Sequence, residues 1–221
     1  MMQVSLGDLK KKNWITVGLS GADHNINLLV DSKLSFFKDD SVDYVYSSHL
    51  IEHLTNEAVL ALFKSVYRIL KPESTFRLVA PDRRIFINAY LEGNIAKVSY
   101  GPRTWGEEVK ACVEANKLNK SLLQPHQLLA NYFCAYNKPA NDGPLFDKAE
   151  IDKRINNPEE LTEWCNQFYD EERVGGHINS WDTNKALNYL TKAGFKAKLS
   201  KFKDDDLAIR KTYSFYVEGV K

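Results

Sequence analysis

Residues 39–54 read DDSVDYVYSSHLIEHL, an apolar run followed by a polar segment that holds two histidines. The run Val42–Tyr46 predicts a β-strand, because β-branched and aromatic residues favour strands. Apolar residues at helical spacing follow and predict an amphipathic helix. They are Leu54, Ala58, Leu62, Val66 and Leu70. Phe76–Ala80 predicts a second buried strand, which completes a βαβ unit. Ligands bind beyond the carboxyl ends of such strands, so Ser47–His53 occupy the expected place for a site.

Short β-rich runs upstream of this unit predict three more strands. They are Val4–Leu6, Ile15–Val17 and Asn25–Val30, and the third ends at Asp31. The link between the first two is too short for an ordinary parallel crossover, which needs roughly a dozen residues. We therefore expect either a compressed helical turn or an irregular edge of the sheet at that point.

The C-terminal part returns to a β-rich pattern after a long helix-prone region. Thr183–Ala193 predicts an amphipathic helix that ends at Gly194. Strands at Phe195–Phe202 and Thr212–Val220 follow, and their short polar link favours an antiparallel hairpin. The region before this helix is aromatic and interrupted by prolines. We interpret residues 100–176 as a helical insertion or cap within a single domain that spans residues 1–221, because insertions over a rigid sheet commonly carry specificity.

Composition narrows the class of protein. Lys and Arg total 30 and Asp and Glu 29, a net charge of +1, so no overall field favours nucleic acid or an anionic membrane. The three cysteines, Cys112, Cys134 and Cys165, form no Cys-x-x-Cys pair, which argues against a disulfide framework and a structural zinc site. No signal peptide or membrane span is apparent. We expect a cytoplasmic protein that acts on a small molecule, and the sequence leaves its oligomeric state open.

Several of these segments resemble class I S-adenosylmethionine-dependent methyltransferases, of the small type 11-like family. The resemblance is carried by residues 40–54, by residues 67–82 (YRILKPESTFRLVAPD) and by Leu190–Phe195. It implies a Rossmann-like α/β fold with a seven-stranded, mostly parallel sheet, helices on both faces and a C-terminal antiparallel hairpin. The helical insertion then falls between strands 5 and 6. The resemblance also implies that S-adenosylmethionine binds across the carboxyl ends of the first strands.

Two positions of the expected cofactor site differ from the family pattern. In this family the first strand opens into a glycine-rich loop, and the second strand ends in an acid that holds the ribose hydroxyls. This chain has Gly7-Asp8 at the first place and Gly18 at the second. Gly18 would let the backbone come close to the cofactor in place of a side chain.

Other residues are further candidates for cofactor binding. Asp8, Asp23 or Asp31 could supply the missing carboxylate, and Asp31, at the expected end of the third strand, could accept a hydrogen bond from an adenine amine. Ser47 and Ser48 either hydrogen-bond the cofactor or simply terminate their strand.

Catalysis of methyl transfer depends mainly on alignment, because the reaction is an in-line displacement at a sulfonium. A base is needed only when the acceptor loses a proton. His49 and His53 follow the strand at residues 42–46 and are the candidate general bases, because imidazole titrates near neutral pH. In the alternative interpretation, Glu52 and His53 brace the loop by hydrogen bonds.

The insertion contributes candidates for an acceptor pocket, although aromatic residues in helices more often form core. These candidates are Trp105, His126, Tyr132, Tyr136, Trp164, Phe168 and His177.

Two other functions remain open. His49–His53 read HLIEH, which also matches the His-x-x-Glu-His signature of inverted zinc peptidases, where both histidines lie on one helix and bind zinc. That signature requires a continuous helix, whereas the segment here follows a strand. The missing glycine loop suggests a second alternative, a catalytically inactive methyltransferase-like interaction module, since fold alone does not establish activity.

Overall fold

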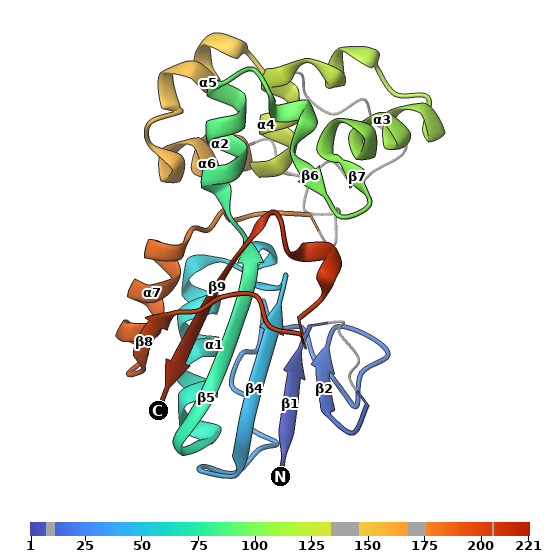
Figure 1. Cartoon of the computed structure of the whole chain (residues 1–221). Coiled ribbons are helices and arrows are strands. Elements are labelled where there is room, and N and C mark those ends of the chain that lie inside the picture. The colour runs from blue at the N-terminus through green and yellow to red at the C-terminus, as the bar shows by residue number, and fades with distance from the viewer. Residues whose placement is uncertain (8–11, 134–145, 168–175, 205) are drawn as a thin grey trace. The chain divides into compact units, whose positions relative to one another are not determined.

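The computed structural model describes residues 1–7, 12–133, 146–167, 176–204 and 206–221 (Figure 1). These residues form two compact units with separate cores. The sheet unit consists of Met1–Pro81, Trp181–Phe202 and Phe215–Lys221, and the helical unit of Asp82–Ser180 and Lys203–Ser214. None of the described helices has the length and apolar character that crossing a membrane requires.

The sheet unit is built on a seven-stranded sheet of order β3-β2-β1-β4-β5-β9-β8. Its strands are β1 (Gln3–Leu6), β2 (Ile15–Gly18), β3 (His24–Asn25), β4 (Val42–Ser48), β5 (Leu70–Pro81), β8 (Lys196–Leu199) and β9 (Ser214–Val220). The first five are parallel, and β8 and β9 pair antiparallel. Backbone bonds from Glu73 to Lys221 and from Asp82 to Tyr213 make β9 antiparallel to β5 as well. The predicted Rossmann-like α/β fold is confirmed.

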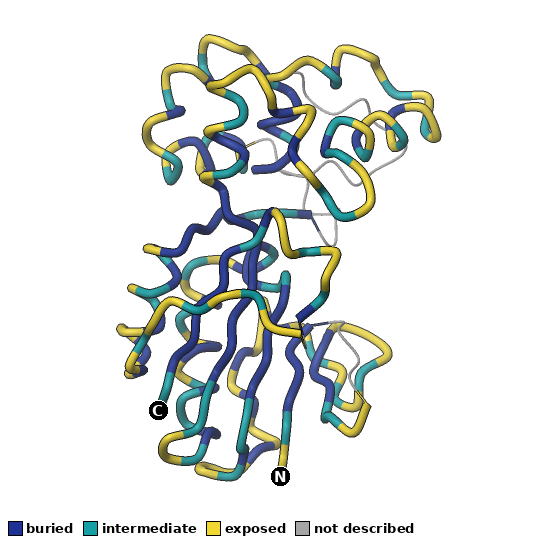
Figure 2. Tube along the Cα trace, in the orientation of Figure 1, coloured by how far each residue is buried: buried dark blue, intermediate teal, exposed yellow. Residues whose placement is uncertain are grey.

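Two helices pack against one face of this sheet. Helix α1 (Asn56–Ile69) and helix α7 (Thr183–Lys192) bury their apolar stripes in a common core with the strands, and Figure 2 shows the central strands as the buried part of the unit. The side chain of Thr55 caps α1 by accepting from the Ala58 N–H. Asp182 caps α7 in the same way through Lys185.

The second face of the sheet differs from the expectation of helices on both faces. Among the described residues, it carries the aromatic cluster of Tyr46, Val79 and Tyr216, against which Trp14 and Phe202 pack. Residues 19–23, which connect β2 to β3, are too few for a crossover helix. Residues 8–11, in the link between β1 and β2, lie outside the described part of the chain.

A buried ion pair also lies on this second face. Arg77 is fully buried, and its guanidinium donates to Glu218 Oε1 at 3.0 Å, to Ser200 Oγ at 2.9 Å and to the Lys201 carbonyl at 2.8 Å. These bonds tie β5 and β9 to the segment that follows β8. The charge of Arg77 is thereby compensated without solvent.

The predicted third strand, Asn25–Val30, is wrong in extent. Only His24 and Asn25 pair with β2, and the chain then turns, because Asn27 accepts from the backbone N–H groups of Leu29, Val30 and Asp31 through its side chain or its carbonyl. The irregular link that follows is held by Arg68 of α1, which donates to the carbonyls of Lys33, Leu34 and Phe37. The Arg68 side chain thus provides hydrogen-bond donors for three backbone carbonyls of a segment that is neither helix nor strand.

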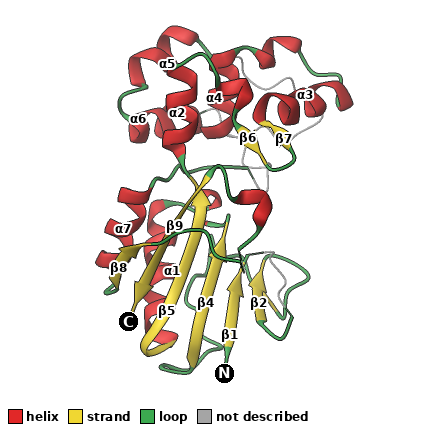
Figure 3. Cartoon of the chain, viewed as in Figure 1, coloured by secondary structure: helices red, strands yellow, loops and turns green. Residues whose placement is uncertain are grey.

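The helical unit has its own aromatic core, and its described part is mainly helical (Figure 3). Its longer helices are α2 (Arg83–Leu91), α3 (Trp105–Ala115), α4 (Pro125–Phe133), α5 (Lys148–Arg154) and α6 (Pro158–Asn166). Its short elements are the 3₁₀ helices η2 (Ile95–Lys97), η3 (Lys120–Leu123) and η4 (Ala208–Arg210), with strands β6 (Ser99–Tyr100) and β7 (Arg103–Thr104). The small hairpin β6–β7 lies in a region where no strand is predicted from the sequence. The interpretation of residues 100–176 as a cap stays a prediction.

Candidate functional site

The carboxyl ends of β1 and β4 bring most of the predicted site residues to one edge of the sheet. Leu6 of β1 pairs with Ser47 of β4, so that Gly7 follows directly beside the segment after β4. Gly7 is buried, has φ +92°, and donates its N–H to the Val17 carbonyl at 2.8 Å. A Cβ on Gly7 would lie 3.7 Å from Leu50 Cβ. The turn after β1 therefore contacts the segment that contains both candidate histidines.

Ser47 and Ser48 end β4 and are both buried. Ser47 Oγ has no hydrogen-bond partner among the described residues. A buried hydroxyl without a partner costs free energy and invites a ligand atom or water as its partner. Among the described residues, the buried hydroxyl of Ser47 is therefore available to hydrogen-bond a cofactor.

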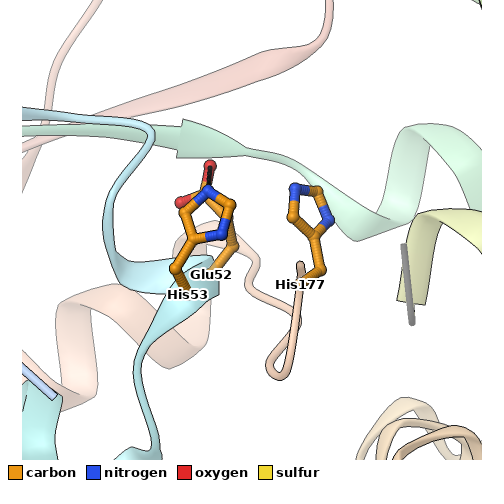
Figure 4. A group of neighbouring side chains, drawn as sticks. All are labelled: Glu52, His53 and His177. Atoms are coloured by element: carbon orange, nitrogen blue, oxygen red, sulfur yellow. Dashed lines mark ion pairs between the residues drawn. The ribbon is translucent and has the colours of Figure 1, made fainter. Parts of the chain in front are cut away.

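The segment after β4 turns sharply at His49, which has φ +55°. This left-handed conformation is uncommon for residues other than glycine, although histidine adopts it more often than most. The His49 N–H still donates to the Val79 carbonyl of β5 at 2.9 Å, so the ladder of the sheet extends to this residue. The chain then forms η1 (Ile51–His53), from which Glu52 and His53 project (Figure 4).

Glu52 lies between the two histidines of this turn. Its Oε1 is 3.5 Å from His49 Nδ1 and 4.0 Å from His53 Nε2. The side chain of Glu52 is 3% exposed, that of His49 10% and that of His53 32%. Both candidate bases therefore contact the same buried carboxylate. The sequence interpretation of Glu52 as a brace for the loop did not include His49.

Trp181 fixes the same turn from a distant part of the sequence. Its indole Nε1 donates to the Ile51 carbonyl at 3.1 Å, and both residues are fully buried within the sheet unit. Tyr189 packs edge-to-face against the indole, and Lys185 Nζ lies 4.4 Å from the ring centroid. No local pattern near Trp181 indicates this contact, so sequence reasoning missed it.

The geometry of the turn contradicts the zinc-peptidase alternative. That signature needs both histidines on one helical turn. Here His49 precedes η1 in a left-handed conformation, and α1 begins only at Asn56 after the cap of Thr55. The two histidines therefore do not share a helix.

Among the described candidate carboxylates, Asp23 and Asp31 each bond to a nearby residue of the chain. Asp23 Oδ2 accepts from the N–H and the hydroxyl of Thr16, each at 2.8 Å, and so braces β2. Asp31 is exposed in the turn after β3, where Oδ1 accepts from the Lys33 N–H. The expectation that Asp31 ends a strand is wrong, because β3 ends at Asn25. Asp8 lies outside the described residues.

Gly18 is buried at the end of β2 and pairs with Asn25, and its carbonyl accepts from the Ile26 N–H at 2.8 Å. At the place where the family pattern has the ribose-binding acid, β2 therefore ends in a glycine, which has no side chain. The Gly18 carbonyl is already hydrogen-bonded within the sheet unit.

The candidates from the insertion are described within the helical unit alone. Trp105 and Tyr132 lie in its core, where Trp105 Nε1 donates to the Leu128 carbonyl and the Tyr132 ring stacks on Phe86. Arg154 lies over Trp164. His177, also drawn in Figure 4, has Nδ1 2.8 Å from the Tyr132 carbonyl. Tyr136 and Phe168 are outside the described residues.

His126 is half-buried in the helical unit. Burial, and secondly the nearby Lys148, lower the pKa of His126 below its ordinary value. Both effects favour the neutral form of this imidazole over its charged form.

Part of the chain matches a known protein family. Residues 19–78 match the family model described as a methyltransferase domain. No curated protein matches the chain.

The solved structures to which the chain is similar include three S-adenosylmethionine-dependent methyltransferases. That of Mesorhizobium loti is 15% identical, with 100% of this chain and 90% of that chain covered and a TM-score of 0.45. That of Thermotoga maritima is 13% identical, with 100% and 81% covered and a TM-score of 0.43. That of Aquifex aeolicus is 9% identical, with 99% and 81% covered and a TM-score of 0.41.

The family match spans β3, β4 and α1 and reaches into β5. It includes residues 40–54, which carry part of the resemblance described for the sequence. Residues 19–78 are thus similar to the methyltransferase domain family, in agreement with the resemblance seen in the sequence.

Proposed function

We propose that the chain is an S-adenosylmethionine-dependent methyltransferase that methylates a hydroxyl or amine of a small molecule, with His49 or His53 as general base. The observation that carries the proposal is the contact between the turn after β1 and the segment after β4, since the Cβ position of Gly7 lies 3.7 Å from Leu50. Cofactor candidates and candidate bases thereby share one edge of the sheet, where ligands bind in open α/β folds.

The residues at this edge fit a cofactor on two grounds. Gly7 is buried in a conformation that disfavours side chains, so cofactor could approach its backbone closely. Ser47 offers a buried hydroxyl with hydrogen-bonding capacity to spare. We propose that Gly7, Ser47 and Ser48 hold the methionine part of S-adenosylmethionine. When bound, this cofactor supplies an electrophilic methyl group on a sulfonium.

The nucleoside part would be held differently from the family pattern. Gly18 offers only backbone at the end of β2, and Asp23 is engaged with Thr16. Asp31 remains a candidate for the adenine amine, since its carboxylate is exposed and makes a single local bond to Lys33. Asp8 remains the other candidate acid next to Gly7.

The two histidines account for the proton that a hydroxyl or amine must lose. A neutral imidazole can accept this proton near neutral pH. The buried carboxylate of Glu52, within 4.0 Å of both rings, would stabilise the imidazolium that results.

The nature of the acceptor follows from charge and composition. A net charge of +1 gives the chain no overall attraction for nucleic acid, which favours a small molecule. We place the enzyme in the cytoplasm because its three cysteines form no disulfide pattern. We also propose that residues 100–176, as an insertion, influence which acceptor is used.

Calorimetric titration of the full chain with S-adenosylmethionine and S-adenosylhomocysteine tests the proposed site. We expect micromolar binding of both nucleosides, and weaker binding after Ser47→Ala and Gly7→Val. Ser32→Ala is the matched control, because the Ser32 hydroxyl is buried but already donates to the Leu28 carbonyl. Failure to bind either nucleoside would remove the proposed function and favour an inactive interaction module. A screen of small hydroxyl and amine compounds, followed by formation of S-adenosylhomocysteine, then identifies the acceptor class.

A further inference from the structure

We propose that Glu52 is a positioning residue for His49. Its carboxylate holds the imidazole proton at Nδ1, so that Nε2 keeps the lone pair that receives a proton from the acceptor. This inference rests on the proposed function, and it identifies His49, in preference to His53, as the general base.

The distances favour His49 as the partner of Glu52. Oε1 lies 3.5 Å from His49 Nδ1 but 4.0 Å from His53 Nε2. The first distance is at the outer limit of a hydrogen bond and the second is beyond it. Catalytic hydrogen bonds are often long before substrate binds and then tighten. A small side-chain adjustment therefore suffices to form the Glu52–His49 bond.

Burial strengthens the same pair. The side chains of Glu52 and His49 are 3% and 10% exposed, whereas that of His53 is 32% exposed. A buried carboxylate needs a hydrogen-bond donor or a cation nearby, and the interaction is stronger where water is excluded. His53 can exchange its contact with Glu52 for contacts with water, so the carboxylate controls its tautomer less.

The backbone holds both members of the pair in place. His49 has φ +55° and donates its N–H to the Val79 carbonyl, which fixes the direction of its Cα–Cβ bond. Glu52 follows Ile51, whose carbonyl accepts from Trp181 Nε1. Such preorganisation lowers the entropy cost of aligning a base with its substrate.

The chemistry of imidazole then assigns the roles of the two nitrogens. A neutral ring carries one proton, and a carboxylate at Nδ1 places it there and leaves Nε2 as the base. When the acceptor loses its N–H or O–H proton, that proton forms a bond to Nε2. The resulting imidazolium is stabilised by Glu52 and later releases the proton to water.

The test is the tautomeric state of His49, followed by NMR of the full chain labelled with ¹⁵N-histidine. The His49 signals are assigned by their loss in His49→Asn, since asparagine also adopts positive φ. We expect the Nδ1–H tautomer in the native chain and a shift toward Nε2–H in Glu52→Gln. Glu57→Gln is the control, because Glu57 is exposed in the first turn of α1 and should leave the signals unchanged.

Two results would overturn the inference: His49 in the Nε2–H form in the native chain, or an unchanged tautomer in folded Glu52→Gln. If Glu52→Gln does not fold, Glu52→Asp replaces it. Aspartate keeps the negative charge, but its side chain is one methylene shorter, so the carboxylate lies farther from His49. We therefore expect a partial shift of the tautomer toward Nε2–H, and an unchanged tautomer would count against the proposal.

Calorimetry on the same samples separates this inference from the proposed function. We expect Glu52→Gln to bind S-adenosylhomocysteine within about twofold of the native chain, because Glu52 is assigned to the base and not to the cofactor. A native chain that binds no nucleoside refutes the proposed function and this role with it. If the native chain binds the nucleoside but the His49 tautomer is the same in Glu52→Gln, the positioning role alone is refuted.

Discussion

The indole Nε1 of Trp181 donates a hydrogen bond of 3.1 Å to the carbonyl oxygen of Ile51, which lies 130 positions earlier in the chain. The same carbonyl accepts from the Leu54 N–H at 3.2 Å. The turn that presents Glu52 and His53 is therefore held by one local and one remote donor.

Trp181→Phe should loosen this turn. Phenylalanine retains an aromatic ring but has no N–H, so it leaves the buried Ile51 carbonyl with one donor fewer, at a cost of about 0.5–1.5 kcal/mol. Urea unfolding measures the loss, and hydrogen exchange at the Leu54 amide should become faster. Trp105→Phe is the control, because Trp105 Nε1 makes an equivalent bond to Leu128 in the helical unit. Slower or unchanged exchange at Leu54 would count against the role of Trp181.

Gly7→Val should weaken cofactor binding more than it destabilises the fold. A Cβ there would meet only ordinary contacts at 3.7 Å, so the cost to stability comes from φ +92° and amounts to about 1–2 kcal/mol. Gly93→Val is matched to it, because Gly93 has φ +72° with no atom within 4 Å of its Cβ position. Calorimetry should show weaker S-adenosylmethionine binding for Gly7→Val alone. Equal affinities in the two variants would exclude Gly7 from the cofactor site.

His49→Asn should lower turnover by about 10²–10⁴-fold once an acceptor that loses a proton has been found. Asparagine tolerates φ +55° but cannot act as a base near neutral pH. His53→Ala should lower turnover to a smaller extent, and both variants should keep the native affinity for the cofactor. Turnover and calorimetric affinity are measured together. A larger loss in His53→Ala would reverse the assignment of the base.

Glu218→Gln should destabilise the sheet unit by about 3 kcal/mol, because it leaves the charge of the fully buried Arg77 uncompensated. Replacing both partners, as Arg77→Met with Glu218→Leu, should recover much of this loss. Glu114→Gln, in the exposed pair with Lys110, should leave the unfolding free energy unchanged. Urea unfolding compares the variants, and equal effects of Glu218→Gln and Glu114→Gln would contradict the prediction.

The helical unit should lose stability on acidification below pH 6.5, the ordinary pKa of His126. Burial, and then Lys148, lower the pKa of His126 in the folded chain, so the unfolded chain binds the proton more readily. This stabilising contribution is complete above pH 6.5 and is lost as pH falls toward the lower folded value. NMR titration should find the pKa of His126 below 6.5, and His126→Asn should show a smaller loss of stability between pH 7.5 and 5.5. A pKa at or above 6.5 would refute the prediction.

The sequence predicts the central unit well because its signals are local and regular. The apolar stripe from Leu54 to Leu70 locates α1. The third strand is predicted wrongly because Ile26, Leu28, Leu29 and Val30 resemble a strand in composition. The hydrogen bonds of Asn27 instead form a turn that buries Leu28 and leaves Val30 exposed.

The site is less accessible to sequence reasoning for two physical reasons. The left-handed conformation of His49 accompanies the hydrogen bond from its N–H to the Val79 carbonyl. The residue type alone does not predict it. The contact of Trp181 with Ile51 depends on the packing of α7, far along the chain. The histidines could be predicted as candidates, but their shared carboxylate and its burial required the structure.

The division of the chain into units has a consequence for its engineering. The helical unit is assembled from two segments, Asp82–Ser180 and Lys203–Ser214, which leave the sheet unit at different strands. The segments depend on each other, because Thr212 Oγ1 bonds Ser99 and a Cβ on Gly101 would lie 2.3 Å from Ile209 Cγ1. An engineered exchange of the helical unit therefore has to replace both segments together.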